Sequence, residues 1–169
     1  MGFFESPLIT KIRRNHGLEH ATIHILSRRN TNLSLVGRSD WNGFTLYGPV
    51  DTAEVNLAVT EALDRLRRGE ANLAVHPRCG TMLATTGLLT SMAAFLAISL
   101  DGSSRGRFRW SSIPGAILAA TGAAIVAQPL GIVLQKRYTT SGQPGNLEIK
   151  GINVKSEAGV VTHRINTTQ

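Results

Sequence analysis

Two long apolar stretches interrupt an otherwise mixed chain. Residues 82–100 and 113–135 contain no charged side chain, and a helix needs about 20 such residues to cross the ~30 Å hydrocarbon core of a bilayer. Both stretches are rich in Gly, Ala, Ser and Thr, which let membrane helices pack closely. Joined by the short polar link 101–110, they predict a transmembrane helical hairpin. The alternative, a pair of buried helices in a soluble core, is disfavoured because both stretches reach spanning length.

The polar and apolar positions before the hairpin predict two amphipathic helices. Ser6 and Pro7 suit a helix start, because Ser caps the first turn and Pro fits the first helical position. Apolar and histidine positions then recur every four residues as far as Arg29, which is the spacing of one helix face. The second helix begins at the capping-box-like residues 51–54 and continues as an apolar stripe to Leu66.

Strand patterns account for much of the remaining chain. Alternating polar and apolar positions predict strands at residues 32–38, 43–50, 146–154 and 159–165, and a short apolar run predicts another at 73–75.

We therefore expect an α+β protein with three parts. Residues 1–81 form a small α-β-β-α-β metal-binding domain, and residues 82–135 form the hairpin. Residues 136–169 form a C-terminal tail with two short strands.

The distribution of charge predicts an orientation in the membrane and a partner. The net charge is +7, and six Lys and Arg residues flank the hairpin against three in its link, which favours both termini in the cytoplasm and a bacterial plasma-membrane location. No aromatic residues alternate with the cations as in a base-stacking platform, so we expect a lipid bilayer as partner and not nucleic acid. With one cysteine, no intrachain disulfide can form.

The candidate chemistry is concentrated in residues 16–20, His-Gly-Leu-Glu-His, which match the inverted zinc-protease pattern His-x-x-Glu-His. On a helix His16 and His20 share one face, as two ligands of a single Zn²⁺ must, and Glu19 lies beside them as a candidate general base. The alternative is that these histidines are hydrogen-bonded packing residues, since so short a pattern also arises by chance.

The order helix, strand, strand, helix, strand, with this motif on the first helix, resembles the core unit of the insulinase and mitochondrial-processing-peptidase-like metallopeptidases and of S-ribosylhomocysteine lyase. The resemblance implies that His16 and His20 bind the metal and that Glu19 takes a proton from a metal-bound water. The peptidases use a downstream glutamate as third ligand, and nothing here matches it. The lyase uses a cysteine, which implies Cys79 in this chain; a small buried thiol is the alternative.

The whole chain also resembles an uncharacterised family of bacterial two-span membrane proteins, chiefly from photosynthetic lineages. The segments that carry this resemblance are His-Gly-Leu-Glu-His-Ala at 16–21 and His-Pro-Arg-Cys-Gly-Thr at 76–81. Membership of that family implies no established activity.

Three further residues are candidate ligands, each with a structural alternative. His76 also suits a polar strand end, His24 a hydrogen bond to a nearby carbonyl, and Glu61 a solvated helix face. If both His76 and Cys79 bind, the ligand shell has no open position, which indicates a structural metal site. Zn²⁺ is the expected ion, with Fe²⁺ as the alternative.

These patterns lead to two hypotheses. The first is a membrane-anchored zinc metallohydrolase, most simply a peptidase, in which Glu19 activates a metal-bound water. Because the related peptidases build their chamber from two or more such units, it would act as a homo-oligomer or within a larger membrane complex. The second is a non-catalytic subunit or assembly factor of a larger, photosynthetic membrane complex, with a structural metal site or none.

Overall fold

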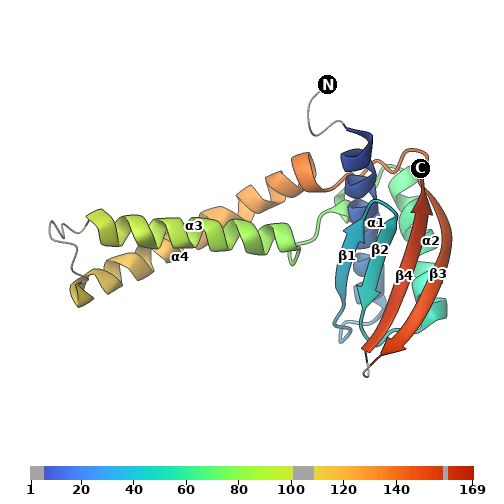
Figure 1. Cartoon of the computed structure of the whole chain (residues 1–169), viewed down its shortest axis with the longest axis horizontal. Helices are drawn as coiled ribbons and strands as arrows, with labels where there is room; N and C mark the ends of the chain where they lie inside the picture. Colours follow the sequence, from blue (N-terminus) through green and yellow to red (C-terminus); the bar gives the residue numbers. More distant parts are fainter. Residues whose placement is uncertain (1–5, 101–108, 158–159) are drawn as a thin grey trace. The chain divides into compact units, whose positions relative to one another are not determined.

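The computed structural model describes residues 6–100, 109–157 and 160–169. The chain forms two compact units, drawn in Figure 1. The sheet unit comprises residues 1–76 and 136–169, and the hairpin unit comprises residues 77–135. Most of the link expected at 101–110 and the first residue of the strand expected at 159–165 lie outside the described residues.

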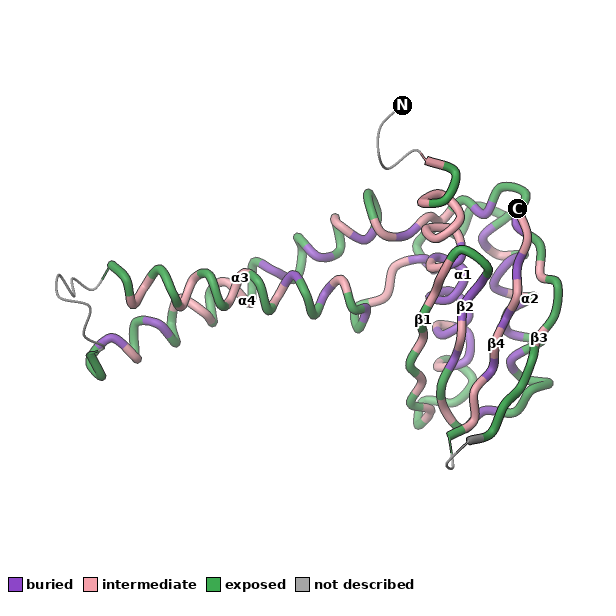
Figure 2. Tube along the Cα trace, in the orientation of Figure 1, coloured by how far each residue is buried: buried purple, intermediate pink, exposed green. Residues whose placement is uncertain are grey.

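The sheet unit has two layers. Its sheet contains four antiparallel strands in the order β1-β2-β4-β3, and helices α1 (Pro7–Arg29) and α2 (Thr52–Arg67) cover one face of it (Figure 1). Phe44 and Leu46 of β2 and Ile165 of β4 project into the core between the layers, and all three are fully buried. The middle of α1 is buried as well (Figure 2).

Both predicted helices are confirmed together with their caps. The Ser6 hydroxyl accepts a hydrogen bond from the Ile9 backbone N–H at 3.3 Å, and Pro7 opens α1. The Asp51 carboxylate accepts from the backbone N–H groups of Ala53 and Glu54, so it satisfies two donors that a helix start leaves without intrahelical partners.

The first hairpin of strands is shorter than expected. β1 (Val36–Asp40) and β2 (Gly43–Tyr47) replace the predicted 32–38 and 43–50, and Asp40 pairs with Gly43 across the turn. Gly43 has φ +140°, and a Cβ there would stand 2.0 Å from the carbonyl oxygen of Ile165. Close approach to β4 therefore requires glycine at this position.

The predicted strand at residues 73–75 is wrong. This segment forms a short 3₁₀ helix, η2 (Ala71–Ala74), closed by local hydrogen bonds such as Val75 N–H to the Asn72 carbonyl at 3.2 Å. The carbonyls of Ala74 and Val75 are bonded by histidine side chains of α1. With those groups satisfied by side chains, no neighbouring strand is needed.

The two strands predicted in the C-terminal tail are present, and they belong to the same sheet as β1 and β2. β3 (Glu148–Glu157) and β4 (Val160–Thr168) form a hairpin, but β4 pairs with β2 along its length, from Gly43↔Asn166 to Tyr47↔Thr162. His163, Ile165 and Thr167 alternate inward and are buried. A two-stranded hairpin is marginally stable alone. Pairing with β2 stabilises it, because the inward-facing side chains of β4 are then buried.

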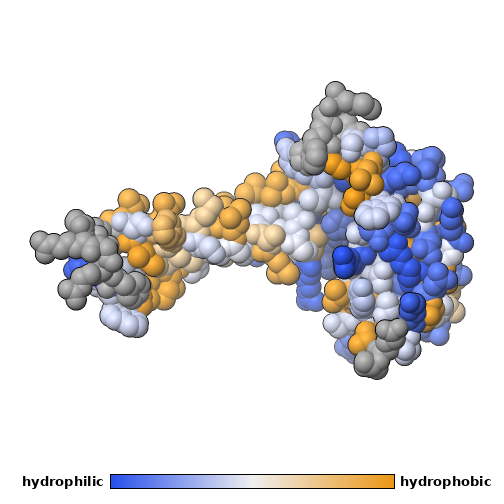
Figure 3. Space-filling view, viewed as in Figure 1, coloured by the Kyte–Doolittle hydropathy of each residue, from blue (hydrophilic) through white to orange (hydrophobic). Residues whose placement is uncertain are grey.

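The hairpin unit consists of α3 (Gly80–Leu100) and α4 (Ile113–Leu134) packed against each other. By length and composition both can cross a membrane, as predicted. Only 6% and 11% of the residues in their most apolar windows are buried, so apolar side chains cover the outside of the pair (Figure 3). Close contact depends on small residues, since a Cβ at Gly131 would lie 2.3 Å from the Met82 sulfur.

Candidate metal centre

Four of the five histidines of the chain form one cluster beside α1 in the sheet unit. His16, His20 and His24 occupy successive turns of α1, and the ring centroids of His16 and His20 are 4.4 Å apart. His76 follows η2, and its ring centroid lies 5.8 Å from that of His20 and 5.0 Å from that of His24. The four-residue spacing on α1 predicted the first three, whereas the approach of His76 depends on the tertiary fold.

Hydrogen bonds orient the two motif histidines in the same way. The Nδ1 of His16 lies 2.9 Å from the carbonyl oxygen of Thr139, and the Nδ1 of His20 lies 2.8 Å from that of Ala74. A carbonyl only accepts, so Nδ1 donates a proton in each case, and Nε2 is the nitrogen that can carry a lone pair. This is how metal-binding histidines are usually held, with the second nitrogen donating to a carbonyl or carboxylate.

His24 has the opposite orientation. Its Nε2 lies 2.8 Å from the carbonyl oxygen of Val75, so its lone pair is on Nδ1. This hydrogen bond agrees with the alternative considered for His24, a partner of a nearby carbonyl.

Glu19 is buried on the side of α1 that faces β1, with 4% of its surface exposed. A Cβ at Gly37 would lie 2.1 Å from Oε1 of Glu19, so the carboxylate packs directly on the strand backbone. Burial raises the pKa of Glu19, while the nearby His16 and a hydrogen bond from Ser39 act in the opposite direction. Within the described chain its buried Oε2 has no hydrogen-bond partner, which is rare for a buried polar atom and calls for an explanation.

Gly17 explains how His16 acquires its partner. A Cβ at Gly17 would lie 2.0 Å from the carbonyl oxygen of Ser141, and the Ser141 N–H donates to the carbonyl of Arg13 at 2.9 Å. The segment 139–141 therefore lies directly on α1, which places the Thr139 carbonyl beside His16. A side chain at position 17 would block this contact, so the close approach of the segment to α1 requires glycine here.

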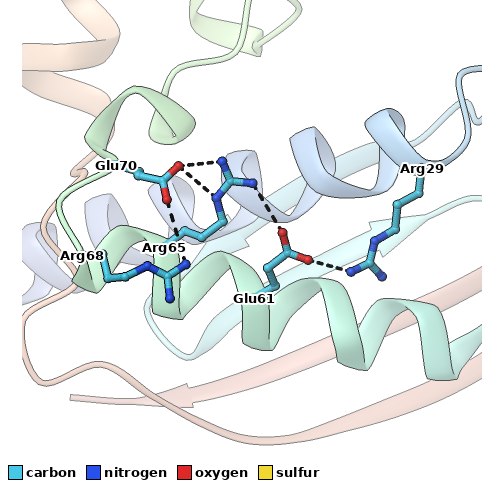
Figure 4. A network of polar contacts seen from close by, with 5 residues as sticks. All are labelled: Arg29, Glu61, Arg65, Arg68 and Glu70. Atoms are coloured by element: carbon cyan, nitrogen blue, oxygen red, sulfur yellow. Dashed lines mark hydrogen bonds and ion pairs between the residues drawn. The ribbon is translucent and has the colours of Figure 1, made fainter.

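The remaining candidate ligands lie in different settings. Cys79 is buried and belongs to the hairpin unit, three residues after His76. Glu61 makes ion pairs on the exposed side of α2, at 2.6 Å to Arg29 and 3.4 Å to Arg65 (Figure 4). Both carboxylate oxygens of Glu61 are thus engaged by arginines, which agrees with the solvated-face alternative.

Sequence reasoning missed the groups that orient the site. The carbonyls of Ala74 and Thr139 lie 54 and 123 residues from the histidines that they bind, and Ser39 and Gly37 come from β1. Only Gly17 gave a local signal that a distant segment would approach.

Comparison with known proteins places the chain in a family. A model described as "Domain of unknown function (DUF6391)" matches residues 11–152, so the chain belongs to that family. It is 37% identical over 162 residues to an uncharacterized protein of Picosynechococcus sp., a match that covers 90% of the chain and 77% of the relative. No solved structure matches. The matched residues include most of α1, all of α2 and the whole hairpin unit, and they end within β3.

Proposed function

We propose that the protein is a membrane-anchored zinc metallohydrolase, most simply a peptidase, with His16, His20 and Cys79 as ligands and Glu19 as general base. The observation that supports it best is the matched orientation of two histidines. Each donates Nδ1–H to a backbone carbonyl and keeps its lone pair on Nε2. The two rings thus have the hydrogen-bonded second nitrogen that metal-binding histidines usually have, and they lie one turn apart on one helix face.

Cys79 is our third ligand because of its chemistry and its place in the chain. Two histidines and a thiolate are a donor set that can hold a metal ion and that zinc accepts. His76 belongs to the cluster with His20, and three residues of extended chain span at most about 11 Å. Cys79 therefore stays within reach of the histidines by covalent connection alone.

Glu19 fits the part of a base in this site. When bound, zinc would polarise a substrate carbonyl and make water a better nucleophile near neutral pH. Burial raises the pKa of Glu19, which brings the carboxylate closer to the pH at which it exchanges protons most effectively. Its buried Oε2, without a hydrogen-bond partner in the described chain, is free to accept a proton.

The hairpin would anchor this site at a membrane. His20 and His24 bind the carbonyls of Ala74 and Val75, a few residues before α3 begins at Gly80. His16 binds the carbonyl of Thr139, five residues after α4 ends at Leu134. The histidines are thus bonded to the chain close to both ends of the hairpin, so a hydrolase built this way would act at the bilayer surface, on segments of membrane proteins.

One observation favours the second candidate, a non-catalytic membrane subunit with a structural metal. The His76 ring lies 5.8 Å from that of His20. If His76 joined His16, His20 and Cys79, four protein ligands would leave no position for substrate.

Zinc content separates these possibilities first. We expect about one zinc per chain in the detergent-purified protein, and loss of zinc in Cys79→Ser and in His20→Ala. His24→Ala serves as the matched control, because His24 shares the helix face but has the opposite ring orientation. A folded parent protein without zinc, or with iron in its place, would overturn the zinc hydrolase.

Activity is then tested on the metal-loaded protein. We expect the parent protein in liposomes to cleave members of a fluorogenic peptide library, and Glu19→Gln to be inactive at equal zinc content. Zinc retained by Cys79→Ser but lost on adding His76→Ala would assign the third ligand to His76. Cleavage at the same rate by the parent protein and Glu19→Gln would overturn the role of Glu19.

A further inference from the structure

Two groups of cations in the sheet unit have different partners. One group forms ion pairs with acidic side chains: Arg29, Arg65, Arg67, Arg68 and Arg164 each pair with Glu or Asp. The second group, which we call the basic end, consists of Lys11, Arg13 and Arg14 of α1 together with Lys136 and Arg137. Within residues 6–100, 109–157 and 160–169, no ion pair involves a member of the basic end.

The fold holds the basic end together with neutral partners only. The Arg13 guanidinium donates to the carbonyl oxygens of Arg137 at 2.9 Å and Thr140 at 3.3 Å. The Arg14 guanidinium donates to the side-chain amide oxygens of Asn146 at 3.2 Å and Gln169 at 3.3 Å. These bonds position the guanidinium groups without neutralising them, so positive charge accumulates here.

Chain connectivity determines the position of this charge relative to the end of α4. Lys136 and Arg137 are the second and third residues after Leu134, the last residue of the apolar helix α4. At ~1.5 Å per helical residue, they follow the end of α4 by about 5 Å. The headgroup region of a bilayer is roughly 5–8 Å thick on each side. If α4 spans the membrane, both side chains lie at the level of the lipid headgroups, and Arg13 is bonded to the same segment.

We propose that the basic end binds the headgroups of anionic phospholipids. Only the membrane-anchored part of the proposed function is needed for this inference; the metal and the hydrolysis are not. Lys136 and Arg137 are exposed, and juxtamembrane cations of this kind attract anionic lipid. Such binding would hold the His16 end of α1 against the headgroups, since His16 is bonded to Thr139 in the same segment.

A membrane lipid suits the basic end better than other anions. A nucleic acid would need the cations on a surface away from the bilayer, and these cations adjoin the end of a membrane-length apolar helix. A free phosphate could bind cations anywhere on the surface, so the position of these cations beside a membrane-length helix does not favour it. The common chemistry is a phosphate group, so the test must separate a lipid from a soluble phosphate.

The test measures lipids retained by the full-length protein. It is purified from mixed micelles of phosphatidylglycerol and phosphatidylcholine with equal acyl chains, and bound lipids are counted by native mass spectrometry. We expect the parent protein to retain phosphatidylglycerol preferentially. Lys136→Gln/Arg137→Gln should lower that preference roughly 10-fold or more, since each juxtamembrane cation attracts anionic lipid. Lys150→Gln/Lys155→Gln on β3 removes the same charge from exposed positions elsewhere and should change it little.

Several outcomes would overturn the proposal. They are no preference in the parent protein, an equal loss in both double variants, displacement of lipid by equimolar glycerol phosphate, or tighter binding of a DNA duplex than of lipid. Zinc content, measured on the same samples, distinguishes the lipid-binding proposal from the proposed metal centre. Lost lipid preference at unchanged zinc concerns the basic end alone, whereas lost zinc with retained lipid concerns the metal centre alone.

Discussion

The two helices of the sheet unit are both capped and amphipathic but bury different kinds of residue. Every buried residue of α2 is apolar, from Val55 to Leu66, and its Glu61 and Arg65 belong to an ion-pair network (Figure 4). The buried part of α1 includes Asn15, Glu19, His20 and Thr22. Burying polar groups costs stability unless each is fully bonded, and Glu19 keeps an oxygen without a partner in the described chain.

The difference indicates that α2 mainly stabilises the fold, whereas α1 carries the candidate site. α2 follows the rules of a stable helix throughout, whereas α1 departs from them at the positions of the His-x-x-Glu-His motif. Departures of this kind are expected at functional sites, where the rest of the fold compensates for them. Four substitutions test this contrast, beginning with the largest expected effect.

Glu19→Gln keeps the shape of the buried side chain and removes its charge and its capacity as a base. If Glu19 is the general base, hydrolysis should fall by roughly 100- to 10,000-fold. Zinc per chain should not change. The free energy of unfolding should not fall either, because burial already disfavours the charged carboxylate. Peptide cleavage, zinc content and urea unfolding are measured on one preparation.

Glu54→Gln, at an exposed position of α2, is the matched control and should change none of the three. A joint loss of zinc and stability in Glu19→Gln would make Glu19 a structural residue, and the contrast with α2 would then concern folding alone.

Gly17→Ala should move the segment 139–141 away from α1. In an open helix, Ala in place of Gly stabilises by up to ~1 kcal/mol. Here the new Cβ would lie 2.0 Å from the Ser141 carbonyl oxygen, and such overpacking costs about 1–3 kcal/mol. The sign of the change in unfolding free energy, measured in urea, therefore decides whether this segment docks on α1.

Gly151→Ala is the control, since a Cβ there meets nothing within 4 Å. We also expect weaker zinc binding in Gly17→Ala, because His16 would lose its carbonyl partner. A variant that is more stable than the parent protein and binds zinc normally would contradict the docking of this segment.

The same residues show how much of this candidate site could be predicted from the sequence. Motif spacing and helix caps are local signals, and they correctly predicted that His16 and His20 share a helix face and where both helices begin. The partners of the histidines are backbone carbonyls, which every residue carries, so no side-chain pattern marks Ala74 or Thr139. β4 was predicted as a strand, but its place in the sheet was not, because its inward alternation fits a separate hairpin as well as a central strand. Only pairing with β2 decides between them.

His163 extends the contrast to the sheet, because it is a buried polar residue outside the motif. Its Nε2 lies 3.1 Å from the Thr52 hydroxyl, and its buried Nδ1 has no partner in the described chain. Burial lowers the pKa of His163, and the Asp51 charge offsets this in part. The unfolded chain therefore binds a proton at a higher pH than the folded chain does.

Stability should accordingly be complete above pH ~6.5, the usual pKa of histidine, and should decline as the pH falls below it. One such group contributes at most about 1.4 kcal/mol per pH unit. We expect His163→Gln to flatten the decline in urea unfolding measured between pH 7.5 and 5.5. An unchanged slope would show that His163 is protonated equally in both states and that the loss of stability comes from other groups.

Glu61→Gln should have the smallest effect and tests the α2 side of the contrast. The Arg29–Glu61 pair is 2.6 Å long, but both side chains are well exposed, at 41% and 37%. Exposed pairs contribute at most about 1 kcal/mol and weaken with salt. We expect a small loss of unfolding free energy that disappears at high salt and becomes smaller in an Arg29→Gln background, where only the longer pair with Arg65 remains, with zinc content unchanged. If Glu61→Gln instead released zinc, Glu61 would be a ligand, and α2 would share in the site that we assign to α1 and Cys79.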